Sequence, residues 1–249
     1  MTRIYSLALF CTFLLTISCN KSTKQPPPNI IYILADDLGY GELGSYGQKL
    51  IETPNIDRLA AEGMMFTQHY SGAPVCAPAR CILLTGKHGG HAYIRGNDEM
   101  AERGDVWDFA AATNDPNLEG QRPIPSGTNT IGKLLQSGGY TTACIGKWGL
   151  GAPLTEGAPN KQGFDFFYGY NCQRQAHTYT PLHLWKNDKK VYLENELIIP
   201  RTKLDSLADP TLEESYDKFN QPVLSTISMA EEALSFIDDN KENPFFLYF

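Results

Sequence analysis

Residues 29–41 are Asn29-Ile30-Ile31-Tyr32-Ile33-Leu34-Ala35-Asp36-Asp37-Leu38-Gly39-Tyr40-Gly41, an apolar run followed by a glycine-rich loop. A continuous rather than alternating apolar run predicts a strand that is buried on both faces, as is typical of a parallel sheet. The pair Asp36 and Asp37 then follows the carboxyl end of this strand. Open α/β sheets bind their ligands at that edge.

Helix signals and apolar runs alternate along the rest of the chain, which predicts an α/β fold with a doubly wound, mostly parallel sheet. The segment Arg95–Ser126 has no clear period, and we predict a long surface insertion there. The last apolar run stops at Phe249, so we expect the fold to be incomplete at its C-terminus. The expected elements are helices over Thr53–Gly63, Thr130–Ser137 and Thr226–Asp238, and strands over Met64–Tyr70, Tyr140–Ile145 and Pro244–Phe249.

Two of these helices have an apolar face that is visible in the sequence. Apolar residues recur three and four positions apart, the spacing of one side of an α-helix. The faces consist of Ile56, Leu59 and Ala60 in the first helix and of Ala230, Ala233, Leu234 and Ile237 in the last.

The segment Val75–Gly86 has a cysteine, a proline and an arginine at alternate positions, Cys76, Pro78 and Arg80. Proline is favoured at the first helical position, so Cys76 is expected at or just before a helix start, where free N–H groups and the helix dipole favour an anion. Arg80, one turn further on, can direct its planar guanidinium to the same place. Taken alone, the motif is more typical of a small buried cysteine.

Composition limits the classes of protein to consider. The chain has 249 residues and a formal net charge of −7, which is enough length for one sizeable α/β core. Without a basic excess we expect no nucleic-acid partner. The cysteines of the mature domain predict neither a disulfide framework nor a zinc site, because they are scattered and form no CxxC pair.

Residues 1–19 resemble a signal peptide, with Arg3 before the apolar run Ile4–Ile17, which is too short to span a membrane comfortably. The run ends in Ser18-Cys19, which resembles a bacterial lipobox with Cys19 as the lipidated residue; ordinary signal-peptidase cleavage is the alternative. Residues 20–27 are expected to be a linker. We therefore expect a bacterial protein that is exported to the periplasm or anchored to a membrane by an N-terminal lipid.

Three polar groups follow strand ends or begin a helix: Asp36 with Asp37, Cys76 with Arg80, and Lys147. Adjacent carboxylates repel unless a cation joins them, and Ca²⁺ or Mg²⁺ take oxygen ligands. Each group alone has an ordinary explanation, a turn for the aspartates and a solvated surface position for the lysine. Together they suit the transfer of a tetrahedral oxyanion.

With these motifs, the chain resembles the N-terminal part of type I, formylglycine-dependent sulfatases of the arylsulfatase class, in the alkaline phosphatase superfamily. Order and spacing agree from about residue 28 to the end, so 28–249 is expected to be the N-terminal part of a catalytic domain. The matching segments are Pro28–Gly41, Thr53–Ala60, Cys76–Gly86, Gly139–Trp148, Gly163–Gly169 and Pro244–Phe249.

The resemblance implies a mechanism. Cys76 would be oxidised to formylglycine by a dedicated maturation enzyme, and its hydrate would attack the sulfur of a sulfated small molecule or glycan. Asp36 and Asp37, with residue 76, would bind Ca²⁺, with Mg²⁺ as the alternative. Arg80 would keep the hydrate ionised, and Lys147 would contact the sulfate oxygens.

The chain also departs from the family pattern. Many relatives have histidine after the Gly-Lys-Trp turn, where this chain has Gly149. His177 is a candidate substitute or substrate-binding residue, and a structural histidine in an aromatic segment is the alternative. The family's leaving-group histidine and further metal ligands would lie beyond Phe249, so we expect this chain alone to be inactive or nearly so.

Two other functions stay open from the sequence. One is a phosphatase or phosphonate monoester hydrolase of the same superfamily, because sulfate and phosphate esters share their geometry. The other is a non-catalytic, truncated lipoprotein.

Overall fold

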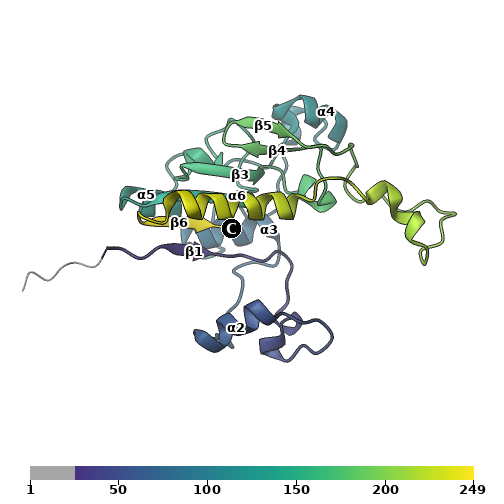
Figure 1. Cartoon of the computed structure of the whole chain (residues 1–249). Coiled ribbons are helices and arrows are strands. Elements are labelled where there is room, and N and C mark those ends of the chain that lie inside the picture. The colour runs from purple at the N-terminus through teal and green to yellow at the C-terminus, as the bar shows by residue number, and fades with distance from the viewer. Residues whose placement is uncertain (1–25) are drawn as a thin grey trace, which may run out of the picture.

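The computed structural model describes residues 26–249, which form a six-stranded sheet with helices on both faces (Figure 1). The predicted signal peptide, Cys19 and most of the linker lie outside the described residues. The first four strands in spatial order are parallel and the last two form an antiparallel hairpin. The predicted mostly parallel α/β sheet is therefore confirmed. In spatial order the strands are β1 (Ile30–Tyr32), β6 (Phe245–Tyr248), β2 (Thr141–Lys147), β3 (Phe166–Tyr170), β4 (His183–Lys186) and β5 (Lys189–Tyr192).

Side chains of the central strand β6 alternate between two hydrophobic clusters, one on each face of the sheet. Phe246 and Tyr248 pack in the cluster that holds α3 (Cys76–Thr85) and Leu135 of α5 (Ile131–Ser137). Phe245 and Leu247 pack against α6 (Ser225–Asn240), which crosses the opposite face. Because each face is covered by helices, the doubly wound arrangement is confirmed.

The buried face of α6 differs from the predicted one. Leu234 is 65% exposed, whereas Phe236, which the sequence pattern left out, is 7% exposed and lies edge-on to Phe245 with 5.7 Å between ring centroids. The face in contact with the sheet uses Ala233 and Phe236, with Met229 and Ile237 partly buried. The prediction for Leu234 was wrong because the bulky Phe236 turns the helix toward the sheet.

Two strand predictions need correction. Residues 64–70 form no strand; Met64 and Tyr70 are 79% and 78% exposed in an irregular segment. The strand β1 exists but is not buried on both faces, since Ile31 is 48% exposed and Ile33 is 66% exposed. The reason is its place in the sheet: among the described residues, β1 pairs only with β6 and so forms an edge.

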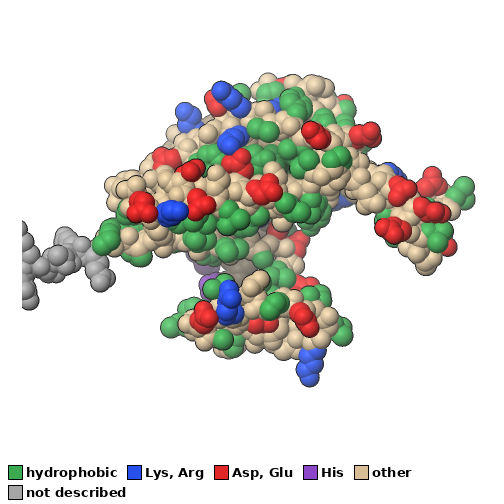
Figure 2. Space-filling model, in the orientation of Figure 1, with side chains coloured by type: hydrophobic (Ala, Val, Ile, Leu, Met, Phe, Trp, Pro, Cys, Tyr) green, Lys and Arg blue, Asp and Glu red, His purple; other side chains and the backbone are tan. Residues whose placement is uncertain are grey.

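The segment around α2 (Pro54–Glu62) projects away from the sheet (Figures 1 and 2). The helix was predicted correctly, but its apolar face is open, with Leu59 64% exposed. Thr53 precedes it without capping it; its hydroxyl accepts from Gly44 N at 2.8 Å and donates to Asp57 at 3.0 Å. Local polar contacts rather than a core hold this helix.

The segment 95–126 is not the surface insertion that the sequence suggested. It contains α4 (Phe109–Asn114), and it buries apolar side chains such as Val106 and Ile124 together with the polar Glu119 and Gln121. No helix in residues 26–249 is both long and apolar enough to cross a membrane. The short 3₁₀ helices of the described chain are Tyr40–Glu42, Gly44–Tyr46, Ala101–Arg103, Pro116–Leu118, Pro159–Lys161, Gln175–Thr178 and Glu213–Phe219.

Candidate active site

The start of α3 places Cys76 at the carboxyl edge of the sheet. Val75 is the extended N-cap residue, Cys76 is the first helical residue, and Ala79 N donates the first helical hydrogen bond to Val75 O at 3.1 Å. Pro78 therefore occupies the third helical position rather than the predicted first one. Its missing N–H costs nothing there, because the first four N–H groups of a helix have no partner within it.

Asp36, which follows β1, meets residues from two other elements. Lys147 at the end of β2 forms an ion pair with Asp36 Oδ2, and Arg80 Nη2 lies 3.6 Å from Asp36 Oδ1. Arg80 Nη1 also donates to the carbonyl oxygen of Lys147 at 3.0 Å. The thiol of Cys76 lies between them: its Sγ is 3.5 Å from Lys147 Nζ and 3.9 Å from Asp36 Oδ1. Four residues distant in sequence thus form one cluster.

The two cationic side chains of this cluster are more buried than its carboxylate. The side chains of Arg80 and Lys147 are 6% and 8% exposed, and that of Asp36 is 43% exposed. Partial burial raises the pKa of Asp36, but the hydrogen bond and charge of Lys147, together with Arg80, outweigh it and hold this pKa below its ordinary value. Arg80 Nε is buried without a hydrogen-bond partner among the described residues. The cluster therefore has a spare donor.

Asp37 and His177 line the same cavity, about 420 Å³ in volume, as Asp36, Arg80 and Lys147. Asp37 adopts a left-handed backbone conformation with φ of 55°. Burial, and next the positive charge of Lys147, lower the pKa of His177. Within residues 26–249, neither Asp37 nor His177 makes a side-chain hydrogen bond or ion pair with the cluster. His177 therefore lies in a cavity that Cys76 does not line; Cys76 lines a neighbouring cavity together with Asp36, Asp37 and Arg80.

The donors for a divalent cation are of the right kind but too few. Asp36 and Asp37 offer the oxygen ligands that Ca²⁺ and Mg²⁺ prefer. Ca²⁺ takes six to eight such ligands, and among residues 26–249 no three His, Cys, Asp or Glu side chains gather into a metal site. Asp36 is also paired with Lys147 and Arg80. The His, Cys, Asp and Glu side chains of the described residues thus supply only part of a coordination shell.

Two residues that the sequence did not suggest lie beside the start of α3. Asn97 Oδ1 accepts a hydrogen bond from Ala77 N at 3.0 Å, and Gln173 Nε2 donates to the same oxygen at 3.2 Å. Neither residue is part of a periodic or charged pattern. The sequence feature related to them is Gly149, because Gln173 occupies the space that a side chain at position 149 would need.

The chemistry of the main cluster suits an oxyanion. Two fixed cations and a side chain at a helix start converge on one point, where developing negative charge is stabilised without reorganisation. This fold, with this cluster at its carboxyl edge, defines a chain of the alkaline phosphatase superfamily. The sulfatase family model matches residues 28–249. The chain therefore belongs to the sulfatase family.

Several curated proteins resemble this chain over part of their length. Human arylsulfatase D is 38% identical over 167 residues, which cover 65% of this chain and 26% of that protein. Human steryl-sulfatase is 40% identical over 154 residues, covering 60% and 24%. Rat N-acetylgalactosamine-6-sulfatase is 37% identical over 172 residues, covering 69% and 31%. The matched regions are thus about a quarter to a third of these relatives.

Solved structures match the fold over nearly the whole chain. A sulfatase of Bacteroides thetaiotaomicron, described with the metabolism of multiple glycosaminoglycans, has a TM-score of 0.63 and 25% identity; the match covers 90% of this chain and 50% of that one. A second structure, solved with its substrate D-glucosamine-2-N,6-O-disulfate, has a TM-score of 0.60 and 26% identity, covering 89% and 33%.

Proposed function

We propose that the protein containing residues 28–249 hydrolyses sulfate esters, with residue 76 as the nucleophile. The observation that carries this proposal is the convergence of Lys147 and Arg80 on Asp36 beside Cys76 at the start of α3. Membership in the sulfatase family supports it. The activity is proposed for the whole protein, because the chain spans only part of its relatives.

The side chains of the cluster have distinct roles in this proposal. Lys147 binds sulfate oxygens, because its ammonium is held by burial and reaches residue 76. Arg80 fixes the orientation of this edge through the carbonyl oxygen of Lys147 and adds a second positive charge beside Asp36. Oxidation of Cys76 to formylglycine by a maturation enzyme would supply a hydrated aldehyde as the nucleophile. Removing one such fixed donor costs about 10²–10³-fold in rate.

Asp36 and Asp37 would hold part of the shell of a Ca²⁺ ion, or of Mg²⁺. Such an ion would polarise the sulfate group. The pairing of Asp36 with Lys147 and Arg80 keeps this carboxylate oriented toward residue 76. Backbone and amide oxygens and water are further ligands that such an ion accepts.

A sulfated sugar is the substrate class that we propose. Among the structural relatives, one was solved with a disulfated glucosamine, which supports this class for the neighbouring fold. His177 lines the cavity beside Lys147, where a neutral imidazole could contact a sugar hydroxyl.

We also propose that the protein is exported, with Cys19 as a lipidated residue. Metabolic labelling with a fatty acid tests this, and Cys19→Ser should abolish the label.

The experiment starts with maturation. Mass spectrometry of the peptide ending at Arg80, after co-expression with a formylglycine-generating enzyme, should show formylglycine at position 76. Paired assays on an aryl sulfate and an aryl phosphate should then favour the sulfate. Lys147→Ala should lower that rate about 10²–10³-fold, while Lys161→Ala, an exposed lysine, should not. Equal or greater turnover of the phosphate would favour a phosphatase instead, and loss of neither activity in Lys147→Ala would contradict the proposed role of this cluster.

A further inference from the structure

Gln173 occupies the space that a side chain at position 149 would need. Gly149 is buried and has φ of 74°. A Cβ atom added there would lie 2.6 Å from both Cγ and Cδ of Gln173, closer than real Cβ contacts allow. Gln173 itself is only 3% exposed. The absence of a side chain at residue 149 therefore leaves room for Gln173, whose side-chain amide fills the space beside Gly149.

The amide of Gln173 is connected to the nucleophile's helix through Asn97. Asn97 Oδ1 accepts from Gln173 Nε2 at 3.2 Å and from the backbone N–H of Ala77 at 3.0 Å. That N–H belongs to the peptide bond that immediately follows residue 76. Because a backbone N–H can only donate, it fixes which end of the Asn97 amide is the oxygen.

The position of Gln173 is in turn held from its backbone. Gln173 N donates to Gln121 Oε1 at 3.1 Å, and Gln121 Nε2 donates to Glu99 Oε1 at 2.6 Å. The guanidinium of Arg174 lies 3.0 Å from the same Glu99 oxygen. These contacts connect residue 173, which follows β3, to the 97–121 segment. They leave Gln173 Oε1 buried without a partner among the described residues.

We propose that Asn97 and Gln173 are a positioning pair that orients residue 76 for attack, and this inference rests on the proposed sulfatase function. Gln173 Nε2 holds Asn97, and Asn97 holds the peptide that follows residue 76. The pair acts through hydrogen bonds rather than through volume. Among the described residues, the pair is connected to residue 76 through the hydrogen bond from Ala77 N to Asn97. Removing the pair should therefore lower turnover and leave substrate binding nearly unchanged.

Matched substitutions separate a hydrogen-bond role from a packing role. Gln173→Glu keeps the size of the side chain but removes the donor. If Asn97 turned its amide to donate to an ionised carboxylate, Ala77 N would lose its acceptor, so the connection would break in either arrangement. Gln173→Met, which has no donor in any protonation state, is measured beside Gln173→Glu because a protonated glutamate could still donate to Asn97. Asn97→Asp keeps an acceptor for both donors, whereas Asn97→Ala removes it. Gln221→Glu, outside the residues that line the cavity, controls for the added charge.

Two measurements on the matured full-length protein test the pair. We expect Gln173→Glu and Asn97→Ala to lower kcat about tenfold or more with KM nearly unchanged, since small misplacements at a reacting centre cost up to about 100-fold. Asn97→Asp should retain most of the kcat. Hydrogen exchange at the Ala77 amide, which needs no activity, should quicken in Gln173→Glu and Asn97→Ala but not in Asn97→Asp or Gln221→Glu.

The two measurements also keep this inference separate from the proposed function. If the wild-type protein is inactive while Ala77 exchange responds as expected, the sulfatase proposal fails and the connection to the helix start stands as a structural one. If Gln173→Glu matches the wild type in kcat and in Ala77 exchange, Gln173 is only a filler and the positioning pair is refuted. An equal loss in Asn97→Asp and Asn97→Ala would refute it as well. Thermal melting of each variant identifies any that fails to fold.

Discussion

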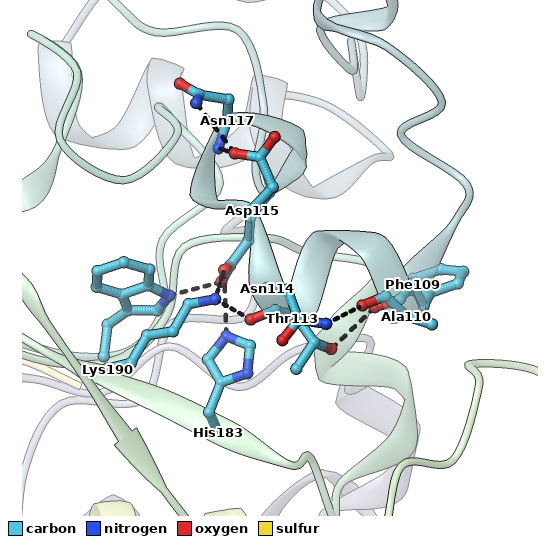
Figure 3. Close-up of polar contacts among 10 residues, drawn as sticks. Phe109, Ala110, Thr113, Asn114, Asp115, Asn117, His183 and Lys190 are labelled. Carbon is cyan, nitrogen blue, oxygen red and sulfur yellow. Dashed lines mark hydrogen bonds and ion pairs between the residues drawn. The ribbon is translucent and has the colours of Figure 1, made fainter.

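Two carboxylate clusters in this molecule use similar side chains in opposite surroundings. Asp36 meets Lys147 and Arg80 at the edge of the sheet, and its side chain is 43% exposed. Glu119 is fully buried, and its partners come from the hairpin of β4 and β5 (Figure 3 shows His183 and Lys190 at this cluster). The comparison separates a cluster that can receive a ligand from one that can only stabilise the fold.

The difference lies in how buried the carboxylate is and in whether it faces a cavity. Glu119 Oε1 accepts from Trp185 Nε1 at 2.6 Å, and Glu119 Oε2 lies 3.1 Å from His183 Nε2 and 3.8 Å from Lys190 Nζ. Both oxygens are therefore used. Asp36, Arg80 and Lys147 line a cavity of about 420 Å³, and the Asp36 side chain is 43% exposed. Access to a cavity, more than charge itself, marks the site that can bind a ligand.

Removing the buried carboxylate should have the largest effect. Glu119→Ala leaves Lys190, His183 and the Trp185 N–H without their shared acceptor. Breaking a buried pair by removing one partner costs about 3–5 kcal/mol, so we expect the free energy of unfolding to fall by about that amount. Urea unfolding at neutral pH measures it.

A matched control for this change is Glu232→Ala, because Glu232 pairs with the half-exposed Lys186 at 2.7 Å. Exposed pairs contribute about 0–1 kcal/mol. If both variants lost the same stability, the contrast between buried and open carboxylates would not hold.

A smaller loss of stability is expected when Glu119 stays and only one of its hydrogen-bond donors is removed. Trp185→Phe removes the Nε1–H that donates to Glu119 Oε1. An unsatisfied buried polar group costs about 1–3 kcal/mol, to which the smaller ring adds a packing loss. Urea unfolding should place this variant between Glu119→Ala and the wild type. A loss as large as that of Glu119→Ala would mean that Trp185, and not the carboxylate, is the centre of the cluster.

The sequence predicted the open cluster and missed the buried one for a physical reason. Asp36, Cys76 and Lys147 each follow a strand or begin a helix, and parallel topology brings such ends to one edge. Glu119 lies in a segment without a period, and its partners are on a hairpin far along the chain. No local pattern encodes a contact of this kind. Gln173 was missed for the same reason.

The sequence also predicted where helices form better than it predicted which of their side chains are buried. The helix signals in residues 53–63 predicted α2, which is present, yet nothing in the sequence showed that Leu59 would remain 64% exposed. In α6 the period was right and the face was shifted, because Phe236 outweighs Leu234 when the helix meets Phe166 and Phe245. Burial is decided by partners, which a single sequence does not name.

At the open cluster, removal of the carboxylate should hardly change stability. Asp36→Asn leaves Lys147 near the thiol of Cys76 and beside a cavity that water can enter. The expected change in the free energy of unfolding is within about 1 kcal/mol, measured by urea unfolding of the unmatured protein. A loss of about 3 kcal/mol or more, the cost of breaking a buried ion pair, would mean that Asp36 is a structural residue like Glu119.

The smallest effect concerns Lys190 and appears only at alkaline pH. Burial lowers the pKa of Lys190 below 10.5, and Glu119 and Asp115 offset this only in part. Between that lowered pKa and 10.5 the unfolded chain binds a proton that the folded chain does not, so stability rises with pH relative to a variant without the amine. We therefore expect the stability of the wild type minus that of Lys190→Met to increase as pH rises through this window. Taking the difference removes the opposite trend from the buried Tyr170 and Tyr248, whose raised pKa values lower stability above about pH 10 in both proteins. A difference that falls with pH would mean that the charges of Glu119 and Asp115 outweigh burial and raise the pKa of Lys190 above 10.5.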